Sequence, residues 1–139
     1  GAMAALLGLD FAAAVAVARE AAAEGGTCQA ANDNDPAQVV VSGTRAAVER
    51  AVAIAKAKGA KRALLLPVPA PFHSALMQPA AEAMAEALAA VTLRAPSVPL
   101  VANVTAEPVS DPDAIRDLLV RQVTGSVRWR ESVLRLAAE

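Results

Sequence analysis

The stretch Arg62-Ala-Leu-Leu-Leu-Pro-Val-Pro-Ala-Pro71 decides how this chain is organised. Its first part, through Val68, is an apolar run that predicts a β-strand. The three prolines between Pro67 and Pro71 then force an extended path and exclude a regular helix. We therefore place the main boundary of the chain here, and we predict two parts, residues 1–70 and residues 71–139.

Residues 1–70 alternate between strand and helix patterns. Asp10 and Thr44 are residue types that cap helices, and Asn32–Pro36 has the composition of a turn. The order βαββαβ is that of a ferredoxin-like unit, in which the second and third strands form a hairpin. The predicted elements are strands over Ala4–Leu9, Thr27–Ala31, Gln38–Ser42 and Arg62–Val68, a helix over Phe11–Ala23, and a helix from Thr44 to Gly59.

Residues 71–139 contain helical patterns but only one strand pattern. One strand among three helices cannot bury both of its faces and pair both of its edges. We therefore expect this part to belong to a larger α/β layer structure, and the chain to be a fragment of class α/β (α+β). The predicted elements are a helix from Pro79 with Met84, Leu88 and Val91 on one face, a strand over Val98–Thr105, a helix from Asp111-Pro112 carrying Ile115, Leu118 and Leu119, and a helix over Trp129–Leu136.

Composition argues against several classes of function. Thirteen Lys and Arg against fourteen Asp and Glu leave a net charge of -1, which is unfavourable for a protein that binds nucleic acid by neutralising phosphates. The longest uncharged stretch, Ala63–Ala81, contains four prolines and fails as a membrane span. The first residues lack a positive region, and Asp10 interrupts them, so we predict a cytoplasmic protein. With one cysteine and one histidine, we expect neither a disulfide nor a metal site.

His73 is the first candidate for proton-transfer chemistry in this chain. It is the single histidine of the chain, and histidine gains and loses a proton most readily near neutral pH. It lies between the rigid proline-rich segment and an amphipathic helix, a junction that can hold an imidazole in a cleft. The residues alone leave two interpretations open, a structural histidine and a general base.

Five stretches in order along the chain resemble malonyl-CoA:acyl carrier protein transacylases. The segment Leu66–Met77, with its Pro-Phe-His-Ser core, resembles the histidine motif of that family. The resemblance implies a ferredoxin-like small subdomain, residues 1–70, followed by part of a hydrolase-like large subdomain that carries the histidine, residues 71–139. The other similar stretches are Gly1–Leu9, the Asn-x-Asn-x-Pro-x-Gln hairpin of Asn32–Gly43, Pro99–Val104, and Val120–Trp129.

The resemblance implies a two-step acyl transfer that belongs to fatty acid biosynthesis. A serine takes malonyl from malonyl-CoA and passes it to the phosphopantetheine thiol of acyl carrier protein. His73 would be the base that takes the serine proton and returns a proton to the leaving thiol. The implied partners are malonyl-CoA and acyl carrier protein, and no cofactor is implied.

The chain departs from this family at the nucleophile. No Gly-x-Ser-x-Gly turn occurs in it, and Ser42, Ser74 and Ser126 lack that context. The arginine for the substrate carboxylate and the segment that helps form the oxyanion hole would precede Gly1, and we expect the segment that orients the histidine to lie past Glu139. We therefore expect the chain to be inactive on its own.

Four further residues are candidates for substrate binding. An aromatic residue directly before the histidine, here Phe72, goes with malonyl selection in related acyltransferases; a plain core residue is the other interpretation. Asn34 and Gln38 occupy hairpin positions that approach the substrate cleft in the family, although turn chemistry and a solvent-facing strand explain them equally well. Asn103 lies at a strand end, where local backbone hydrogen bonding is its other interpretation.

Two alternative functions stay open. The chain could belong to an acyltransferase domain of a polyketide synthase, which has the same chemistry. It could also be a non-catalytic ferredoxin-like module that binds a partner. A cut enzyme should expose apolar surface and self-associate, whereas a binding module should be monodisperse. The residues expected on that apolar surface are Leu100, Val101, Ile115 and Leu118.

Overall fold

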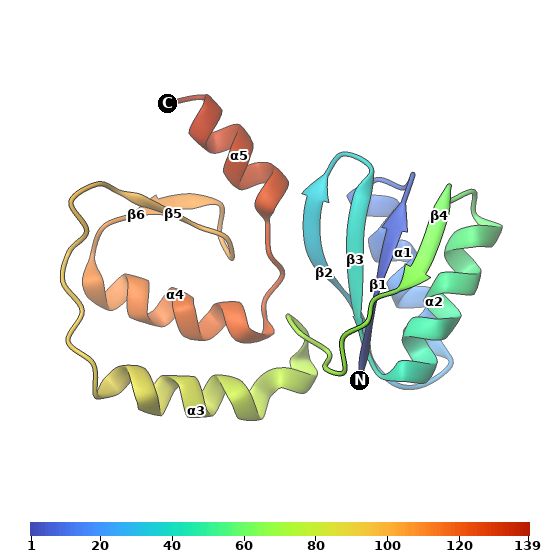
Figure 1. Cartoon of the computed structure of the whole chain (residues 1–139), viewed down its shortest axis with the longest axis horizontal. Helices are drawn as coiled ribbons and strands as arrows, with labels where there is room; N and C mark the ends of the chain where they lie inside the picture. Colours follow the sequence, from blue (N-terminus) through green and yellow to red (C-terminus); the bar gives the residue numbers. More distant parts are fainter.

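The computed structural model describes residues 1–139 and is a mixed α/β structure (Figure 1). No helix in it combines the length and the apolar character that crossing a bilayer requires. Residues 1–70 form β1 (Ala2–Leu7), α1 (Phe11–Ala23), β2 (Cys28–Asp35), β3 (Gln38–Gly43), α2 (Arg45–Ala57) and β4 (Arg62–Leu65). Residues 71–139 form the 3₁₀ helix η1 (Ala75–Met77), α3 (Gln78–Ala89), β5 (Leu100–Ala102), β6 (Glu107–Val109), α4 (Pro112–Thr124) and α5 (Trp129–Ala137).

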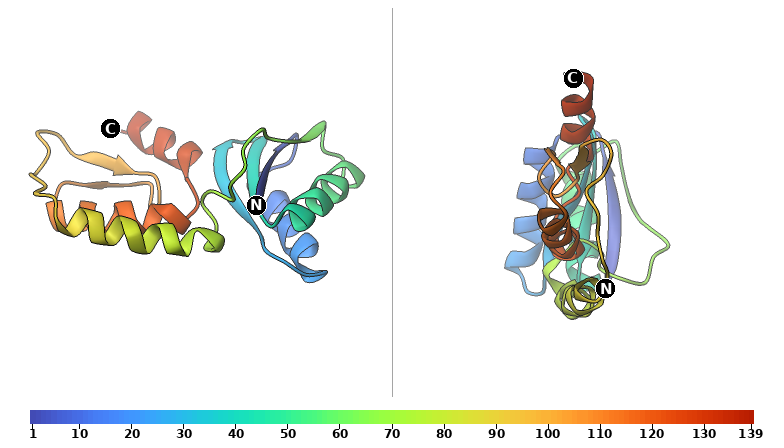
Figure 2. Two further views of the ribbon diagram at one scale, coloured as in Figure 1. Left: turned by 60° about the horizontal axis from the view of Figure 1, so that its bottom comes forward. Right: turned by 90° about the vertical axis from the view of Figure 1, so that its left-hand side faces the viewer.

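The first four strands form one antiparallel sheet in the order β2-β3-β1-β4. Helices α1 and α2 both cover the same face of this sheet (Figure 2). Because side chains alternate along a strand, Leu6 of β1 points to the helices while Met3 points to the opposite face. Leu66 and Val68, which follow β4, pack on that opposite face. The segment that ends the sheet therefore also covers it.

Small side chains allow the two helices to pack closely on the sheet. Alanine accounts for 37 of the 139 residues, and many alanines of α1 and α2 are fully buried between the helices and strands. Bulk in this core comes instead from Leu6, Val17, Val41 and Val48, all with no exposed surface. The buried helix alanines are Ala14, Ala18, Ala21, Ala47, Ala51 and Ala55.

The helix predictions for residues 1–70 are confirmed, but one cap differs. Asp10 caps α1, because its carboxylate accepts a hydrogen bond of 2.8 Å from the amide of Ala13. Thr44 is the N-cap residue of α2, yet its hydroxyl makes no capping bond. That hydroxyl instead donates to the carbonyl of Thr27, the residue directly before β2.

The prediction of a turn over Asn32–Pro36 is wrong for Asn32–Asp35 and holds at Pro36, which forms the turn with Ala37. Strand β2 continues to Asp35, because Asn32, Asp33 and Asp35 all pair with β3. Two register shifts, between Ala30 and Asn32 and between Asp33 and Asp35, accommodate the polar sequence as bulges. Strand β4 in turn is shorter than predicted and ends at Leu65.

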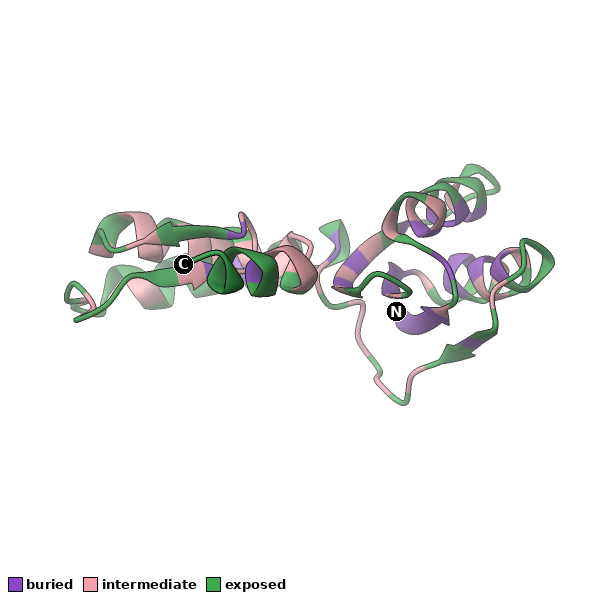
Figure 3. Ribbon diagram, turned by 90° about the horizontal axis from the view of Figure 1, so that it is seen from above, coloured by how far each residue is buried: buried purple, intermediate pink, exposed green.

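Residues 71–139 have much less buried surface than residues 1–70 (Figure 3). Only five of the 28 buried residues lie in this part, namely Ser74, Ala81, Ala102, Ala106 and Ser132. The predicted strand Val98–Thr105 is reduced to β5, which pairs with an unpredicted strand, β6, in a separate antiparallel sheet. The predicted apolar face of α3 is largely open, with Met84 41% and Val91 48% exposed. Here α3 packs against α4 (Figure 1).

Candidate active site

His73 lies on the turn between the proline-rich segment and η1, and its backbone is left-handed, with φ of 57°. A residue with a side chain rarely adopts this conformation, which costs about 1–2 kcal/mol. Such strain persists only where the surroundings hold the residue, and it occurs preferentially at functional sites. The turn therefore fixes the direction of the half-buried imidazole.

Two polar contacts hold this turn. The hydroxyl of Ser74 donates to the carbonyl of Pro71 at 2.7 Å, and the amide of Ala75 donates to Oε1 of Gln29 on β2 at 2.7 Å. Ser74 is fully buried, so its hydroxyl is committed to the turn. This placement agrees with the sequence argument against Ser74 as a nucleophile.

The ring of His73 has a defined partner on α4. Its Nδ1 lies 3.0 Å from the carbonyl oxygen of Gln122. A carbonyl oxygen only accepts hydrogen bonds, so Nδ1 must carry the proton, which leaves Nε2 of the neutral ring free as a proton acceptor. The expectation that the orienting segment lies past Glu139 is wrong, because Gln122 supplies the orienting group within the chain.

The end of α4 is itself fixed by the side chain of Gln122. Its amide donates to the carbonyls of Gly125 at 3.0 Å and Ser126 at 3.3 Å. One residue thus presents a carbonyl to the imidazole and holds the turn that follows with its side chain. Sequence reasoning missed Gln122 because every residue has a backbone carbonyl.

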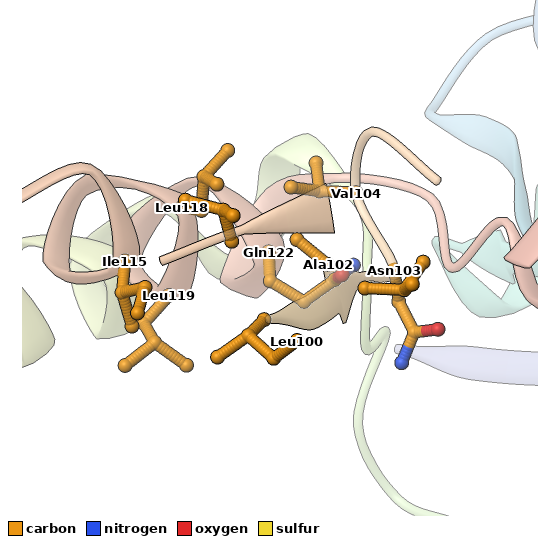
Figure 4. A pocket seen from close by; sticks show the side chains of 10 residues that line it. Leu100, Ala102, Asn103, Val104, Ile115, Leu118, Leu119 and Gln122 are labelled. Carbon is orange, nitrogen blue, oxygen red and sulfur yellow. The ribbon is translucent and has the colours of Figure 1, made fainter. Parts of the chain in front are cut away.

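Gln122 and Asn103 both line an apolar groove between the β5–β6 hairpin and α4 (Figure 4). The groove has a volume of about 200 Å³. Asn103 lies at the end of the groove farthest from Ile115 and Leu119 (Figure 4). Its carbonyl accepts a hydrogen bond of 2.7 Å from the amide of Arg128. The remaining lining residues are Leu100, Val101, Ala102, Val104, Val109 and Leu118.

The other candidate residues lie in different places. Phe72 is 42% exposed and belongs to neither hydrophobic cluster, so the interpretation as a core residue is wrong. Asn34 and Gln38 lie at the hairpin end of β2 and β3, whereas the His73 turn contacts β2 at Gln29. Asn34 lies five positions along the strand from Gln29, which corresponds to about 16 Å. The structure therefore brings His73 together with Gln122, and not with Asn34 or Gln38.

No other nucleophile in the chain is paired with the imidazole. The hydroxyls of Ser42 and Ser126 are buried without any hydrogen-bond partner. Burial raises the pKa of the Cys28 thiol to about 11, partly offset by the charge of Arg50, so the thiol stays protonated at neutral pH. No cluster of three or more His, Cys, Asp or Glu side chains could hold a metal ion.

Fold and site together define a mixed α/β chain that holds one histidine by Nδ1 and leaves Nε2 free. The chain belongs to the acyl transferase domain family, whose family model matches residues 1–139. It is 53% identical over 139 residues to the malonyl CoA-acyl carrier protein transacylase of Escherichia coli K12. That match covers 100% of this chain and 45% of the relative, so the chain spans less than half the length of this relative.

Solved structures of malonyl transferases also superpose on nearly the whole of this chain and on less than half of their own length. The acyl-carrier-protein S-malonyltransferase of Burkholderia pseudomallei 1710b superposes with a TM-score of 0.96 at 53% identity, over 99% of this chain and 44% of that one. A malonyl-transacylase in complex with a type II PKS acyl-carrier protein superposes with a TM-score of 0.94 at 42% identity, over 99% and 44% of the two chains. The whole length of this chain is therefore similar to one region of these longer proteins.

Proposed function

We propose that this chain supplies the catalytic histidine of an enzyme that moves malonyl from coenzyme A to the phosphopantetheine thiol of acyl carrier protein. The observation that carries the proposal is the ring of His73, which donates from Nδ1 to the Gln122 carbonyl and keeps Nε2 free. The names of the relatives supply the substrate class, since they are malonyl transferases acting with acyl carrier protein.

The free Nε2 suits the step that a serine nucleophile requires. A serine hydroxyl is a weak nucleophile at neutral pH, and a neutral imidazole activates it by accepting its proton during attack on the thioester carbonyl. The Gln122 carbonyl would stabilise the imidazolium that forms, in the place that a carboxylate takes in a Ser-His-Asp triad. The imidazolium then returns the proton to the sulfur of the leaving thiol.

The nucleophile in this proposal belongs to a part of the enzyme that the chain does not span. The 139 residues contain no Gly-x-Ser-x-Gly turn, and the chain matches 45% of the length of the E. coli relative. The isolated chain is accordingly proposed to lack transferase activity.

The same proposal assigns two subdomains. Residues 1–70 would be a ferredoxin-like small subdomain, which the strand order β2-β3-β1-β4 and the placement of both helices on one face support. Residues 71–139 would be part of a hydrolase-like large subdomain. Their short separate sheet and small buried core suit a segment that completes a larger structure.

Four residues are proposed to contact the substrate, on different observations. Phe72 is exposed beside His73, where its ring can fill the space of a substituent on the malonyl α-carbon and favour malonyl over methylmalonyl by about 1–3 kcal/mol. Asn103 lines the same groove as Gln122 and is proposed to contact the acyl group or the pantetheine. Asn34 and Gln38, at the hairpin end, would contact the pantetheine farther from the reacting carbonyl.

A chimera tests this function. The matching 139 residues of the E. coli relative are replaced by this chain, and malonyl transfer to acyl carrier protein is assayed. We expect an active chimera that loses about 10²- to 10⁴-fold in rate with His73→Ala, since a general base contributes that much. Unchanged turnover in a folded His73→Ala chimera would remove His73 from the mechanism.

Serine variants are the matched controls in the same chimera. Ser42→Ala and Ser126→Ala remove hydroxyls that have no hydrogen-bond partner, so neither should lower the transfer rate substantially. A loss of activity as large as that of His73→Ala in either variant would instead place the nucleophile within this chain.

A further inference from the structure

An ion pair between a buried carboxylate and a partly exposed guanidinium joins the first sheet to the last helix. Asp33 on β2 is 1% exposed, and the guanidinium of Arg130 on α5 donates to both of its carboxylate oxygens. Nε lies 3.1 Å from Oδ1 and from Oδ2, and Nη2 lies 2.8 Å from Oδ2. This planar two-point geometry fixes orientation as well as distance. The two residues are 97 positions apart, so the pair ties together distant parts of the chain.

The chain directly before Arg130 is attached to the same strand by its backbone. The amide of Val127 donates to the carbonyl of Ala31 at 2.8 Å, and the amide of Asp33 donates to the carbonyl of Val127 at 2.9 Å. Because β2 is an edge strand, Val127 adds a parallel bridge to its free edge. Asp33 makes both contacts, since its amide bonds to Val127 and its carboxylate pairs with Arg130. The ion pair therefore adds a side-chain contact directly beside this backbone attachment.

This attachment leads back to His73 over a short path. Val127 follows the turn at Gly125 and Ser126, whose carbonyls are held by the side chain of Gln122. The carbonyl of the same Gln122 accepts the hydrogen bond from His73. The position of that carbonyl is thus fixed from one side by α4 and from the other by the attachment to β2.

We propose that the Asp33–Arg130 pair is a positioning pair that keeps the Gln122 carbonyl aligned with Nδ1 of His73. The inference rests on the proposed function, in which the alignment keeps Nε2 free to accept a proton. Asp33 and Arg130 do not touch the reacting atoms; they act through the Val127 attachment and the Gln122 turn. Arg130 also has Glu131 within 4.0 Å, a weaker contact than its bonds to Asp33.

The single histidine makes a direct test feasible. In the whole 139-residue chain with ¹⁵N-labelled histidine, a long-range ¹H–¹⁵N spectrum reports only His73, and it distinguishes the Nδ1–H from the Nε2–H tautomer. The spectrum is recorded at alkaline pH, where an imidazole is neutral. We expect the Nδ1–H tautomer to dominate in the unsubstituted chain, and an Nε2–H form there would overturn the proposal.

Arg130→Gln is the main variant and Arg135→Gln its matched control. Arg135 lies on the same helix and pairs only with exposed Glu107 and Glu139. We expect Arg130→Gln to lower the ratio of Nδ1–H to Nε2–H by about fivefold, the factor that one typical net hydrogen bond contributes. Arg135→Gln should leave the ratio unchanged. An unchanged ratio in a folded Arg130→Gln chain would overturn the proposal.

Arg130→Lys covers the case in which Arg130→Gln does not fold. Lysine keeps the charge but not the two-point geometry, so it should restore part of the ratio. A folded Arg130→Lys chain whose ratio of Nδ1–H to Nε2–H equals that of the unsubstituted chain would overturn the positioning role. This holds whether or not the Arg130→Gln chain folds. These outcomes are independent of the chimera assay, because the spectrum reports the ring and not transferase activity.

Discussion

At the scale of single residues, the site depends on one strained backbone position and one carbonyl oxygen. The left-handed φ of His73 directs the ring to α4, where the backbone carbonyl of Gln122 accepts a hydrogen bond from Nδ1. No sequence pattern marks a histidine with a left-handed backbone, and every residue has a backbone carbonyl. The histidine could be predicted from its motif, but its partner could not.

Removing the ring in two ways separates the backbone strain from the side-chain contacts. His73→Ala keeps a Cβ at φ of 57°, whereas His73→Gly removes it. We expect the free energy of unfolding, measured by urea denaturation, to be about 1 kcal/mol higher for the glycine variant than for the alanine variant. The control is Ala53→Gly on the exposed side of α2, which should be destabilising by about 1 kcal/mol. A glycine variant no more stable than His73→Ala would show that the turn is unstrained.

At the scale of elements, the helices of residues 1–70 could be predicted closely and the strands could not. Helix ends carry local chemistry, such as the Asp10 cap and the glycines Gly25 and Gly26, both with positive φ, after α1. Strand ends depend instead on pairing partners distant in sequence. Asn32–Asp35 is a strand because β3 pairs with it, although its composition is typical of a turn.

The contribution of local chemistry to a helix end can be measured at the two aspartate caps. Asp10 caps α1 and Asp111 caps α4, each through a hydrogen bond of 2.8 Å to the third residue beyond it. We expect Asp10→Ala to lower the free energy of unfolding by about 1 kcal/mol, and Asp10→Asn to retain most of it, because asparagine is an equally good cap. Circular dichroism during urea unfolding measures both. An Asp10→Ala chain as stable as the unsubstituted one would show that the cap adds nothing to the core helix.

At the scale of the whole molecule, buried surface is unevenly distributed between the two parts. Residues 1–70 enclose a cluster of 16 buried residues, while residues 71–139 contribute five buried residues in total. The second part keeps an apolar groove open, with Leu100 37% and Leu119 46% exposed. Of the four residues that the sequence analysis expected on an exposed apolar surface, Leu100 is exposed. The other three, Val101, Ile115 and Leu118, are half-buried and line the groove with it.

An open apolar groove should drive association of the isolated chain. We expect its sedimentation coefficient to rise with concentration, and Leu119→Lys to reduce that rise by placing a charge in the groove. Val98→Lys is the control, because Val98 is apolar and 69% exposed but does not line the groove. A loss of association in both variants would assign the effect to net charge alone. An unsubstituted chain that remains one species at every concentration would contradict the prediction and favour the interpretation as a self-sufficient binding module, since such a module buries its own apolar surface.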